Sequence, residues 1–222
     1  MRLSLSSGKK VTIIIILILI LDQVLKLWVK THMYLGQTES IFGGWFQLSF
    51  TENTGFAFGW SLGGTWGKLL LSLFRIVFII ILAVFLNRLI KRKMPMGVLV
   101  GVAMLIAGAA GNIFDSCFYG LIFDTGTVYS PELGYALPYS GVSQLSCDGY
   151  APFLHGSVVD MIQIHIIDGP LPEWIPIWGG KHLTFFGPIF NIADASISIA
   201  IIYLLIFQRK HIGKLLNSKQ KS

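Results

Sequence analysis

Four long apolar runs divide the chain, and each has the length of a membrane-spanning helix. They cover approximately residues 11–30, 67–90, 96–115 and 187–207. The hydrocarbon core of a bilayer is about 30 Å thick and needs roughly 20 apolar helical residues to cross it. The first run follows a basic start, as in a secretory signal, but no small-residue cleavage site follows it. We therefore expect an uncleaved first helix and one mainly α-helical membrane domain over residues 1–222.

Two segments between these runs lose the helical period. In residues 31–66, Gly and aromatic residues alternate, which predicts short strands in a small curled sheet at the membrane surface. Residues 116–186 are too many for a connecting loop, so this segment must have a structure of its own. Its part from His155 to Asp168 alternates partly, which fits a strand or a short helix with Asp160 near its middle.

Composition and charge agree with a membrane protein and indicate its topology. The chain is 54% hydrophobic and only 13% charged, which excludes an ordinary soluble domain. The net charge of +6 comes mainly from three basic clusters that flank the apolar runs. By the positive-inside rule, these clusters place both termini in the cytoplasm and residues 31–66 and 116–186 outside, so they reflect topology rather than nucleic-acid binding. The clusters contain Arg2, Lys9 and Lys10; Arg88, Lys91, Arg92 and Lys93; and Arg209, Lys210, Lys214, Lys219 and Lys221.

An Asn-x-x-Asp pair occurs twice, at the end of the third apolar run and near the start of the fourth. Asn112 and Asp115 form the first pair, and Asn191 and Asp194 repeat the spacing. Residues three apart lie on one helix face, so each helix is expected to present a polar patch. A carboxylate in hydrocarbon costs roughly 2.5–3.5 kcal/mol on insertion scales, and such residues usually face a cavity or a partner. The two helices are therefore predicted to form the walls of an active site.

Other polar positions near the outer ends allow two interpretations each. Asp22 and Lys26 are spaced i and i+4 and can form a structural ion pair, while Asp22 can also face the cavity. The stretch TENTGFAFG, residues 51–59, is either an interfacial aromatic belt or part of a substrate groove. In the second case Asn53 hydrogen-bonds an extended peptide, and Gly55 permits a close approach of the backbone.

Arg75 and two glycines complete the candidates within the apolar runs. Arg75 lies two turns inside the second run, and it either snorkels to the outer surface or places a fixed cation near the carboxylates. The third run is rich in small residues, which let neighbouring helices pack closely. Of these, Gly108 and Gly111 lie in the turn that presents Asn112.

Two cysteines and two histidines fall in the segment predicted outside. Cys117 and Cys147 are expected to form a disulfide there, and the alternative is two unpaired thiols. His155 and His165 lack the ligand spacing of known zinc motifs, so neither a metal site nor a cofactor is predicted.

Five motifs occur in a fixed order along the chain: DQVLK, NTGFAF, GNIFD, VVD and FNIAD. With four apolar runs, this order resembles the bacterial lipoprotein signal peptidases, the type II signal peptidases. The resemblance implies four transmembrane helices and a small extracytoplasmic β cradle in the bacterial cytoplasmic (inner) membrane. It also implies a monomeric aspartic endopeptidase, active at the outer face, that binds membrane lipid and a diacylglyceryl-modified prolipoprotein and cleaves before the lipid-bearing cysteine.

The same resemblance assigns the site residues by motif. Asp160 of VVD and Asp194 of FNIAD are the expected catalytic pair. Residues from the other motifs are expected to hold this pair and the substrate: Asp22, Lys26, Asn53, Gly55, Gly108, Asn112, Asp115 and Asn191.

The chain departs from the family pattern at two places. The family usually has Arg directly after the GNxxD aspartate, where this chain has Ser116. About 35–40 extra residues separate Asp115 from VVD, which predicts a long external insertion between the third and fourth helices, with no role for residues 118–155 evident.

The physical chemistry of two carboxylates supports a shared-proton mechanism. At about 4 Å and an effective dielectric near 20, two carboxylates repel by roughly 4 kcal/mol, or about three pKa units, so the pair should hold one proton. The ionised partner can then activate water while the protonated partner assists the oxyanion or the leaving amine. The alternative is a small proton-coupled transporter that uses the same carboxylates as a relay.

Overall fold

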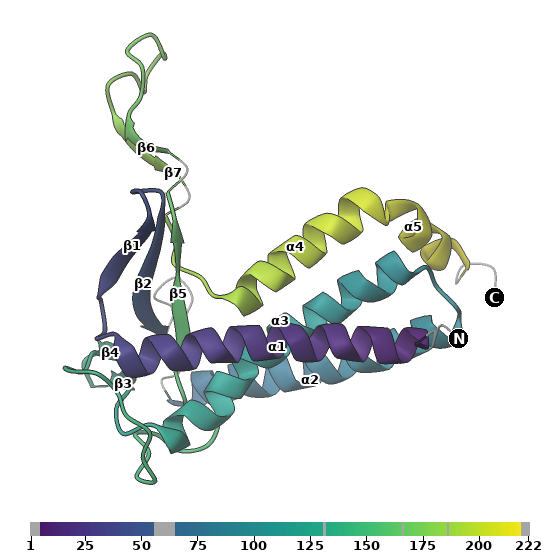
Figure 1. Cartoon of the computed structure of the whole chain (residues 1–222), viewed down its shortest axis with the longest axis horizontal. Helices are drawn as coiled ribbons and strands as arrows, with labels where there is room; N and C mark the ends of the chain where they lie inside the picture. Colours follow the sequence, from purple (N-terminus) through teal and green to yellow (C-terminus); the bar gives the residue numbers. More distant parts are fainter. Residues whose placement is uncertain (1–4, 56–64, 131, 166, 186, 219–222) are drawn as a thin grey trace.

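The protein consists of a bundle of helices with strands gathered at one end (Figure 1). α1 (Ser7–His32), α2 (Thr65–Lys91) and α3 (Met96–Ile122) are long and apolar enough to span a membrane. The shorter α4 (Ile192–Phe207) has 16 residues and is followed by α5 (Arg209–Ser218). The structure is a computed structural model that describes residues 5–55, 65–130, 132–165, 167–185 and 187–218.

α3 is the central helix and packs against α1, α2 and α4. Its glycines make the contact with α4 close, since a Cβ atom at Gly101 would lie only 2.5 Å from Leu204 Cδ2. Apolar side chains from all four helices form the core of the bundle away from the strands. This core contains Val11, Leu86, Leu89, Val98, Leu99, Val102, Ala103, Ile106 and Leu204.

An antiparallel three-stranded sheet lies at the other end of the bundle, in the order β1-β2-β5. Its strands are β1 (Thr38–Phe42), β2 (Phe46–Asn53) and β5 (Val158–Ile164), and β2 has an irregular register between Leu48 and Thr51. The register pairs Thr51 with Asp160. Side chains of the sheet pack on the ends of α1 and α3 in a second core, which contains Val29, Met33, Phe50, Tyr119, Phe123, Val159 and Met161.

Two hairpins extend from this end. β3 (Val128–Ser130) pairs with β4 (Tyr135–Leu137) in the segment after α3. β6 (Ile167–Pro170) pairs with β7 (His182–Phe185), and Figure 1 shows this hairpin reaching away from the helices. The sheet predicted for residues 31–66 therefore includes a third strand from the distant segment that contains Asp160.

The boundaries of two predicted helices were wrong. α3 continues to Ile122 instead of ending at Asp115, because Tyr119 packs into the second core, so residues 116–122 are helical rather than part of the external segment. The fourth helix begins at Ile192 instead of residue 187. Its start is delayed because Phe190 forms an isolated β-bridge with Ile162 and Asn191 caps the helix.

The predicted disulfide is absent, and both cysteines are free thiols. Cys117 is buried on α3, where it packs with Ile113 and Leu154, whereas Cys147 is exposed in the segment after α3. The continuation of the helix explains the difference, since it carries Cys117 into a hydrophobic cluster.

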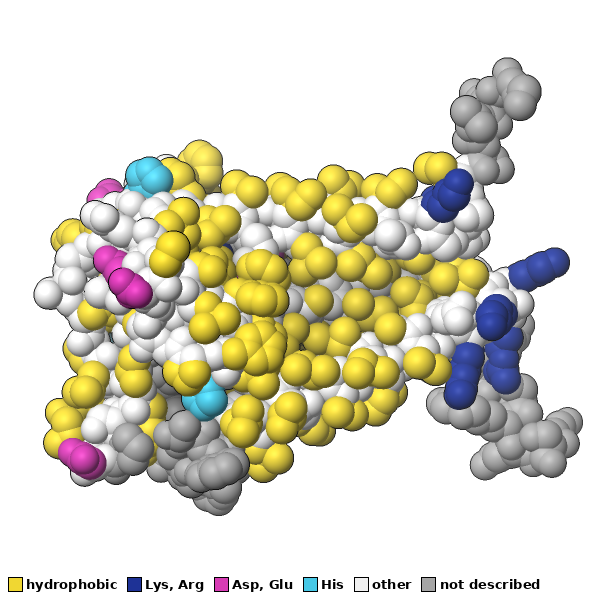
Figure 2. All heavy atoms as spheres, turned by 90° about the horizontal axis from the view of Figure 1, so that it is seen from below, with side chains coloured by type: hydrophobic (Ala, Val, Ile, Leu, Met, Phe, Trp, Pro, Cys, Tyr) yellow, Lys and Arg dark blue, Asp and Glu magenta, His cyan; other side chains and the backbone are white. Residues whose placement is uncertain are grey.

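Charged side chains are segregated along the long axis of the molecule. Figure 2 shows a broad apolar belt between an end with Lys and Arg and an opposite end with Asp, Glu and His. The start of α1 and the whole of α5 lie at the basic end (Figure 1). The belt includes exposed side chains along α2, among them Leu70, Phe74, Val77, Phe78 and Ile81. Such a belt is what a membrane-embedded surface requires.

Candidate active site

The two N-x-x-D motifs meet between the sheet and the helices, where amides connect Asp160 to Asp194. Asn191 Nδ2 donates to Asp160 Oδ1 at 2.6 Å and is also 3.0 Å from Asn112 Oδ1. Asn112 Nδ2 in turn donates to Asp194 Oδ1 at 2.7 Å. The folding of α3, α4 and β5 thus brings two carboxylates and two amides, distant in sequence, into one polar cluster.

The N-x-x-D spacing predicted that Asn191 and Asp194 share a helix face, and this prediction was wrong for Asn191. Asn191 is the N-cap of α4, has an extended backbone, and its Oδ1 accepts the Asp194 N–H at 2.8 Å. This cap satisfies one of the free N–H groups at the start of a helix. It also leaves the amide nitrogen of Asn191 directed at Asp160, so one side chain both begins α4 and holds the carboxylate of β5.

Lys26 connects α1 to α3, because it contacts Asp22 on its own helix and both Asp115 and Asn112 on α3. Its ammonium lies 2.9 Å from Asp22 Oδ2, 2.8 Å from Asp115 Oδ2 and 3.0 Å from Asn112 Oδ1. All three donors of the ammonium therefore have partners, and the predicted Asp22–Lys26 ion pair is confirmed. Asp115 also accepts the Val159 N–H at 3.3 Å, which ties it to the strand that carries Asp160.

Gln23 completes this cluster, although the sequence analysis did not select it. Its Nε2 lies 2.9 Å from Asp115 Oδ1 and 3.2 Å from Asp22 Oδ2, and its Oε1 accepts the Tyr119 hydroxyl at 3.1 Å. The signal was its position beside Asp22 in DQVLK. Asp22 makes a further contact, because its Oδ1 accepts the Ala193 N–H at 2.9 Å in the first turn of α4.

Gly108 and Gly111 allow α4 and Asp22 to approach α3. A Cβ atom at Gly108 would collide with the carbonyl oxygen of Ala193. One at Gly111 would lie 2.7 Å from Asp22 Oδ2 and 3.1 Å from Ala193 Cβ. Both glycines thus leave room for the groups that surround Asn112.

Asp160 has an unusual protonation equilibrium. Its side chain is 5% exposed. Burial first, and then the negative charge of Asp194, raise the pKa of Asp160 from 3.8 to about 7. Two effects oppose this shift but do not cancel it: the positive charge of Lys26 and the hydrogen bond from Asn191. The Asp160 carboxyl can therefore hold a proton near neutral pH.

A groove of about 490 Å³ opens beside Asp160. Its walls come from the end of β2 and from the segment before α4, and they include Asn53 and Ile189. Asn53 Oδ1 accepts the Gly55 N–H at 2.8 Å, and Gly55 has a positive φ of 88°, a conformation that favours glycine. The interpretation of the aromatic residues that follow concerns residues 56–59, which lie outside the described residues.

A second buried ion pair lies farther along α1, and the sequence analysis did not select it either. The Lys30 ammonium pairs with Glu52 Oε1 and donates to the Thr125 carbonyl oxygen at 3.0 Å. The sequence feature that could have indicated this ion pair is the spacing of Lys26 and Lys30, which lie one helical turn apart within an apolar run. Three aromatic rings surround the ammonium, those of Phe123, Tyr139 and Tyr150, with centroids 4.9, 5.1 and 5.3 Å away.

Glu52 has two further donors from the segment after α3. It accepts the Thr127 N–H at 2.6 Å and the Tyr139 hydroxyl at 3.2 Å. Burial first, and then the charge of Glu52, raise the pKa of Tyr139, so its hydroxyl remains a donor. The segment after α3 is thus anchored to α1 and β2, and Glu52 also lines the groove beside Asp160.

Ser116 occupies the position where the family usually has an arginine, and Arg75 is the candidate for a cation near the carboxylates instead. The Ser116 hydroxyl is buried and donates to the Asn112 carbonyl oxygen of its own helix at 3.2 Å. Arg75 on α2 is half-buried, and the carboxylates that stabilise its charge are Asp194, Asp160 and Asp115, in this order. The ion pairs among the described residues do not include Arg75.

Comparisons with known proteins identify the family of the chain. A family model described as signal peptidase (SPase) II matches residues 14–209. A lipoprotein signal peptidase of Porphyromonas gingivalis is 42% identical over 217 residues, which cover 97% of this chain and 90% of that protein. One of Amoebophilus asiaticus is 34% identical over 202 residues, with coverages of 90% and 77%.

Solved structures share the fold. A bacterial membrane enzyme determined by the in meso method at 2.3 Å resolution superposes with a TM-score of 0.55 at 22% identity, covering 93% of this chain and 91% of that one. A second, at 1.9 Å resolution, gives 0.53 at 24% identity, with coverages of 89% and 91%. None of these matches supports the transporter alternative. The chain belongs to the signal peptidase II family, the aspartic peptidases that remove signal peptides from prolipoproteins.

Proposed function

We propose that Asp160 and Asp194 are the catalytic pair of this peptidase. The observation that carries the proposal is the amide connection: Asn191 holds Asp160, which lines the groove, and also contacts Asn112, which holds Asp194. The Asp160 pKa of about 7 supports its role as the partner that keeps the shared proton. Asp194 lies in the first turn of α4, where the helix dipole stabilises a carboxylate, so it is the partner that activates water.

The proposed reaction needs only these two groups and water. Asp194 takes a proton from the water as its oxygen attacks the scissile carbonyl, and Asp160 donates its proton toward the oxyanion or the leaving amine. When Asp160 has protonated the oxyanion, Asp194 passes its proton to the amine as the intermediate collapses, and Asp160 takes back the hydroxyl proton. When Asp160 has protonated the amine directly, the proton from water stays on Asp194, so in both cases the pair ends with one proton. Asp22, Lys26, Asn112, Asp115 and Asn191 hold the carboxylates in place.

We infer that the substrate is a diacylglyceryl-modified prolipoprotein, cleaved before its lipid-bearing cysteine, and that Asn53 and Gly55 contact its extended peptide. The position of the groove at the end of β2 supports this role, because residues 51–53 pair with β5 but not with β1, which leaves one edge of this part of β2 open to an extended chain. All named site residues come from one chain, which favours a monomer as the working unit. Since residues 118–122 belong to α3, we infer that the external insertion is the segment 123–155 and that its role is to hold β2 through Glu52.

We infer four membrane spans, with α4 as the fourth, in the bacterial inner membrane. The segregation of charge supports cytoplasmic termini and an active site at the outer face (Figure 2). Single cysteines at Lys93 and Glu132, in a cysteine-free background, should react with an impermeant reagent only at position 132. Labelling of position 93 in intact cells would overturn the topology.

Single-turnover cleavage of a diacylglyceryl-modified peptide tests the catalytic pair. Asp160→Asn and Asp194→Asn should each fold and bind substrate but lose about 10²–10⁴-fold in rate, the usual scale of general acid-base catalysis. The double variant should be scarcely slower than either single variant, because members of one catalytic unit are not additive. Substantial cleavage by Asp160→Asn together with none by Asp115→Asn would instead assign the second catalytic acid to GNIFD.

A further inference from the structure

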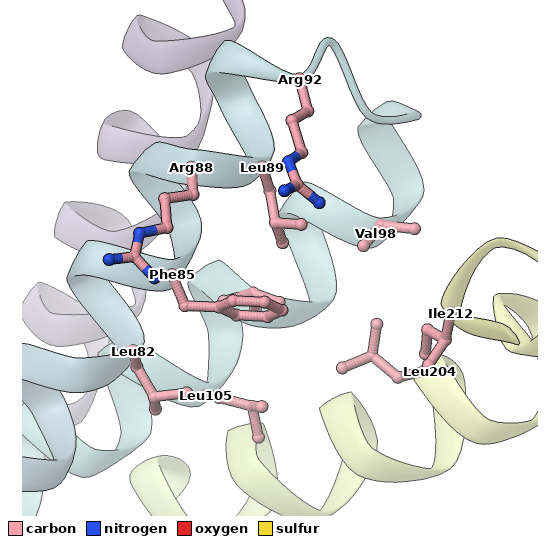
Figure 3. A pocket seen from close by; sticks show the side chains of 10 residues that line it. Leu82, Phe85, Arg88, Leu89, Arg92, Val98, Leu105, Leu204 and Ile212 are labelled. Carbon is pink, nitrogen blue, oxygen red and sulfur yellow. The ribbon is translucent and has the colours of Figure 1, made fainter. Parts of the chain in front are cut away.

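A cavity separate from the polar site lies at the basic end of the bundle. It has a volume of about 250 Å³ and lies between α2, α3, α4 and α5, all of which contribute apolar walls (Figure 3). Phe85 comes from α2, Val98 from α3, Leu204 from α4 and Ile212 from α5. The cavity thus separates α2 from the helix that carries Asp194 at its far end.

Two cations line the same cavity. Arg88 lies in the last turn of α2 and Arg92 directly follows the helix, and Figure 3 shows the Arg92 guanidinium between Leu89 and Val98. The described residues that line the cavity include no acid, and neither arginine takes part in the ion pairs among the described residues. Two exposed guanidinium groups at the mouth of an apolar cavity match an anionic head group joined to a hydrocarbon chain.

We propose that this cavity binds an anionic glycerophospholipid from the leaflet at the basic end. Arg88 and Arg92 hold its phosphate, because the planar guanidinium forms paired hydrogen bonds with phosphate oxygens. An acyl chain fills the space between Phe85 and Leu204. The bound lipid connects α2 to α4 and α5 across a gap that the described side chains leave open.

Charge excludes the other candidate occupants. The cytoplasmic end of a signal peptide is basic, so Arg88 and Arg92 would repel it. A second copy of this chain would bring its own basic end to the same level in the membrane, with α5 contributing Arg209 and Lys210. An anionic lipid is the occupant whose charge and apolar surface both fit.

Lipid retention tests the proposal directly. The full chain is purified in a neutral detergent, phosphatidylglycerol or phosphatidylcholine is added, and bound lipid is counted by native mass spectrometry while unfolding is followed by heating. The wild type should retain phosphatidylglycerol in preference to phosphatidylcholine and unfold at a higher temperature with it. Soluble glycerol phosphate should not raise the unfolding temperature, which distinguishes a lipid site from a phosphate site.

Two matched variants separate the site from the general charge of this end. Arg88→Gln/Arg92→Gln should bind phosphatidylglycerol about 30-fold more weakly, since each basic residue near an anionic lipid contributes roughly fivefold in affinity. Lys9→Gln/Lys10→Gln removes two charges at the same end but none that lines the cavity, and it should bind as the wild type does. Leu105→Phe fills the cavity and should weaken retention with both arginines intact. Equal binding by the arginine variant and its control, or equal binding of both lipids, would overturn the proposal.

Discussion

α1 carries two buried lysines one turn apart, and their surroundings differ. Lys26 contacts two carboxylates and an amide oxygen, all from the helices that carry the polar motifs. Lys30 contacts one carboxylate, a backbone carbonyl and three aromatic rings, most of them from the segment after α3. Both side chains are 0% exposed, so each ammonium is removed from bulk solvent.

This difference indicates two roles on one helix: Lys26 supports the polar cluster around Asp115, and Lys30 anchors the segment after α3. Lys26 is shared by Asp22 and Asp115, so its loss would leave two buried carboxylates without a cation beside the proposed catalytic pair. Lys30 and Glu52 are balanced one to one, and the aromatic rings stabilise the ammonium further. We therefore expect changes at Lys26 to lower the catalytic rate, and changes at Lys30 to lower stability and substrate affinity.

The largest effect is expected for Lys26→Met. Removing one partner of a buried ion pair costs about 3–5 kcal/mol, because it leaves an uncompensated buried charge. This variant should unfold at a lower temperature and lose single-turnover activity even as folded protein. Lys9→Met changes an exposed lysine of the same helix and serves as the control. A Lys26→Met protein with normal kcat would refute the assigned difference.

A double-mutant cycle at Lys30 and Glu52 gives the second comparison. Lys30→Met should destabilise less than Lys26→Met, since one carboxylate rather than two loses its cation and Glu52 keeps Thr127 and Tyr139 as donors. Lys30→Met/Glu52→Gln should recover part of the loss, because no unpaired charge remains. Because Glu52 lines the groove, the KM of Lys30→Met should rise, while its kcat per folded molecule stays near the wild-type value. A fall in the kcat of Lys30→Met with an unchanged KM would instead assign Lys30 the same role in catalysis as Lys26.

Arg75 extends the comparison to a cation with no direct ion-pair partner among the described residues. Its charge acts on Asp194 and Asp160 from a distance, so Arg75→Leu should slow turnover by about tenfold, which corresponds to about 1.4 kcal/mol, without unfolding the protein. Arg75→Lys keeps the charge and should recover most of the rate. Unchanged kinetics in Arg75→Leu would return Arg75 to the snorkelling interpretation.

Sequence patterns predicted those parts of the site that depend on local spacing. The i, i+4 spacing of Asp22 and Lys26 sufficed because both residues lie in one helix. The cap at Asn191 was missed because an N-x-x-D spacing fits both a helix face and an N-cap, and only the strand pairing of Phe190 stops the helix there. Gln23 and Glu52 were missed because, apart from Asp22 beside Gln23, their partners are distant in sequence, and nothing local in the chain indicates which residues the fold brings to them.

As the proposed fourth membrane span, the short α4 has a consequence for the bilayer itself. Sixteen helical residues rise only about 24 Å, less than the hydrocarbon thickness of about 30 Å. Hydrophobic mismatch of this kind is relieved when the bilayer thins around the short helix. The head groups and water of one leaflet then come closer to the first turn of α4, where Asp194 lies. The proposed hydrolysis needs water, and a thinner bilayer around α4 shortens the path by which water reaches Asp194.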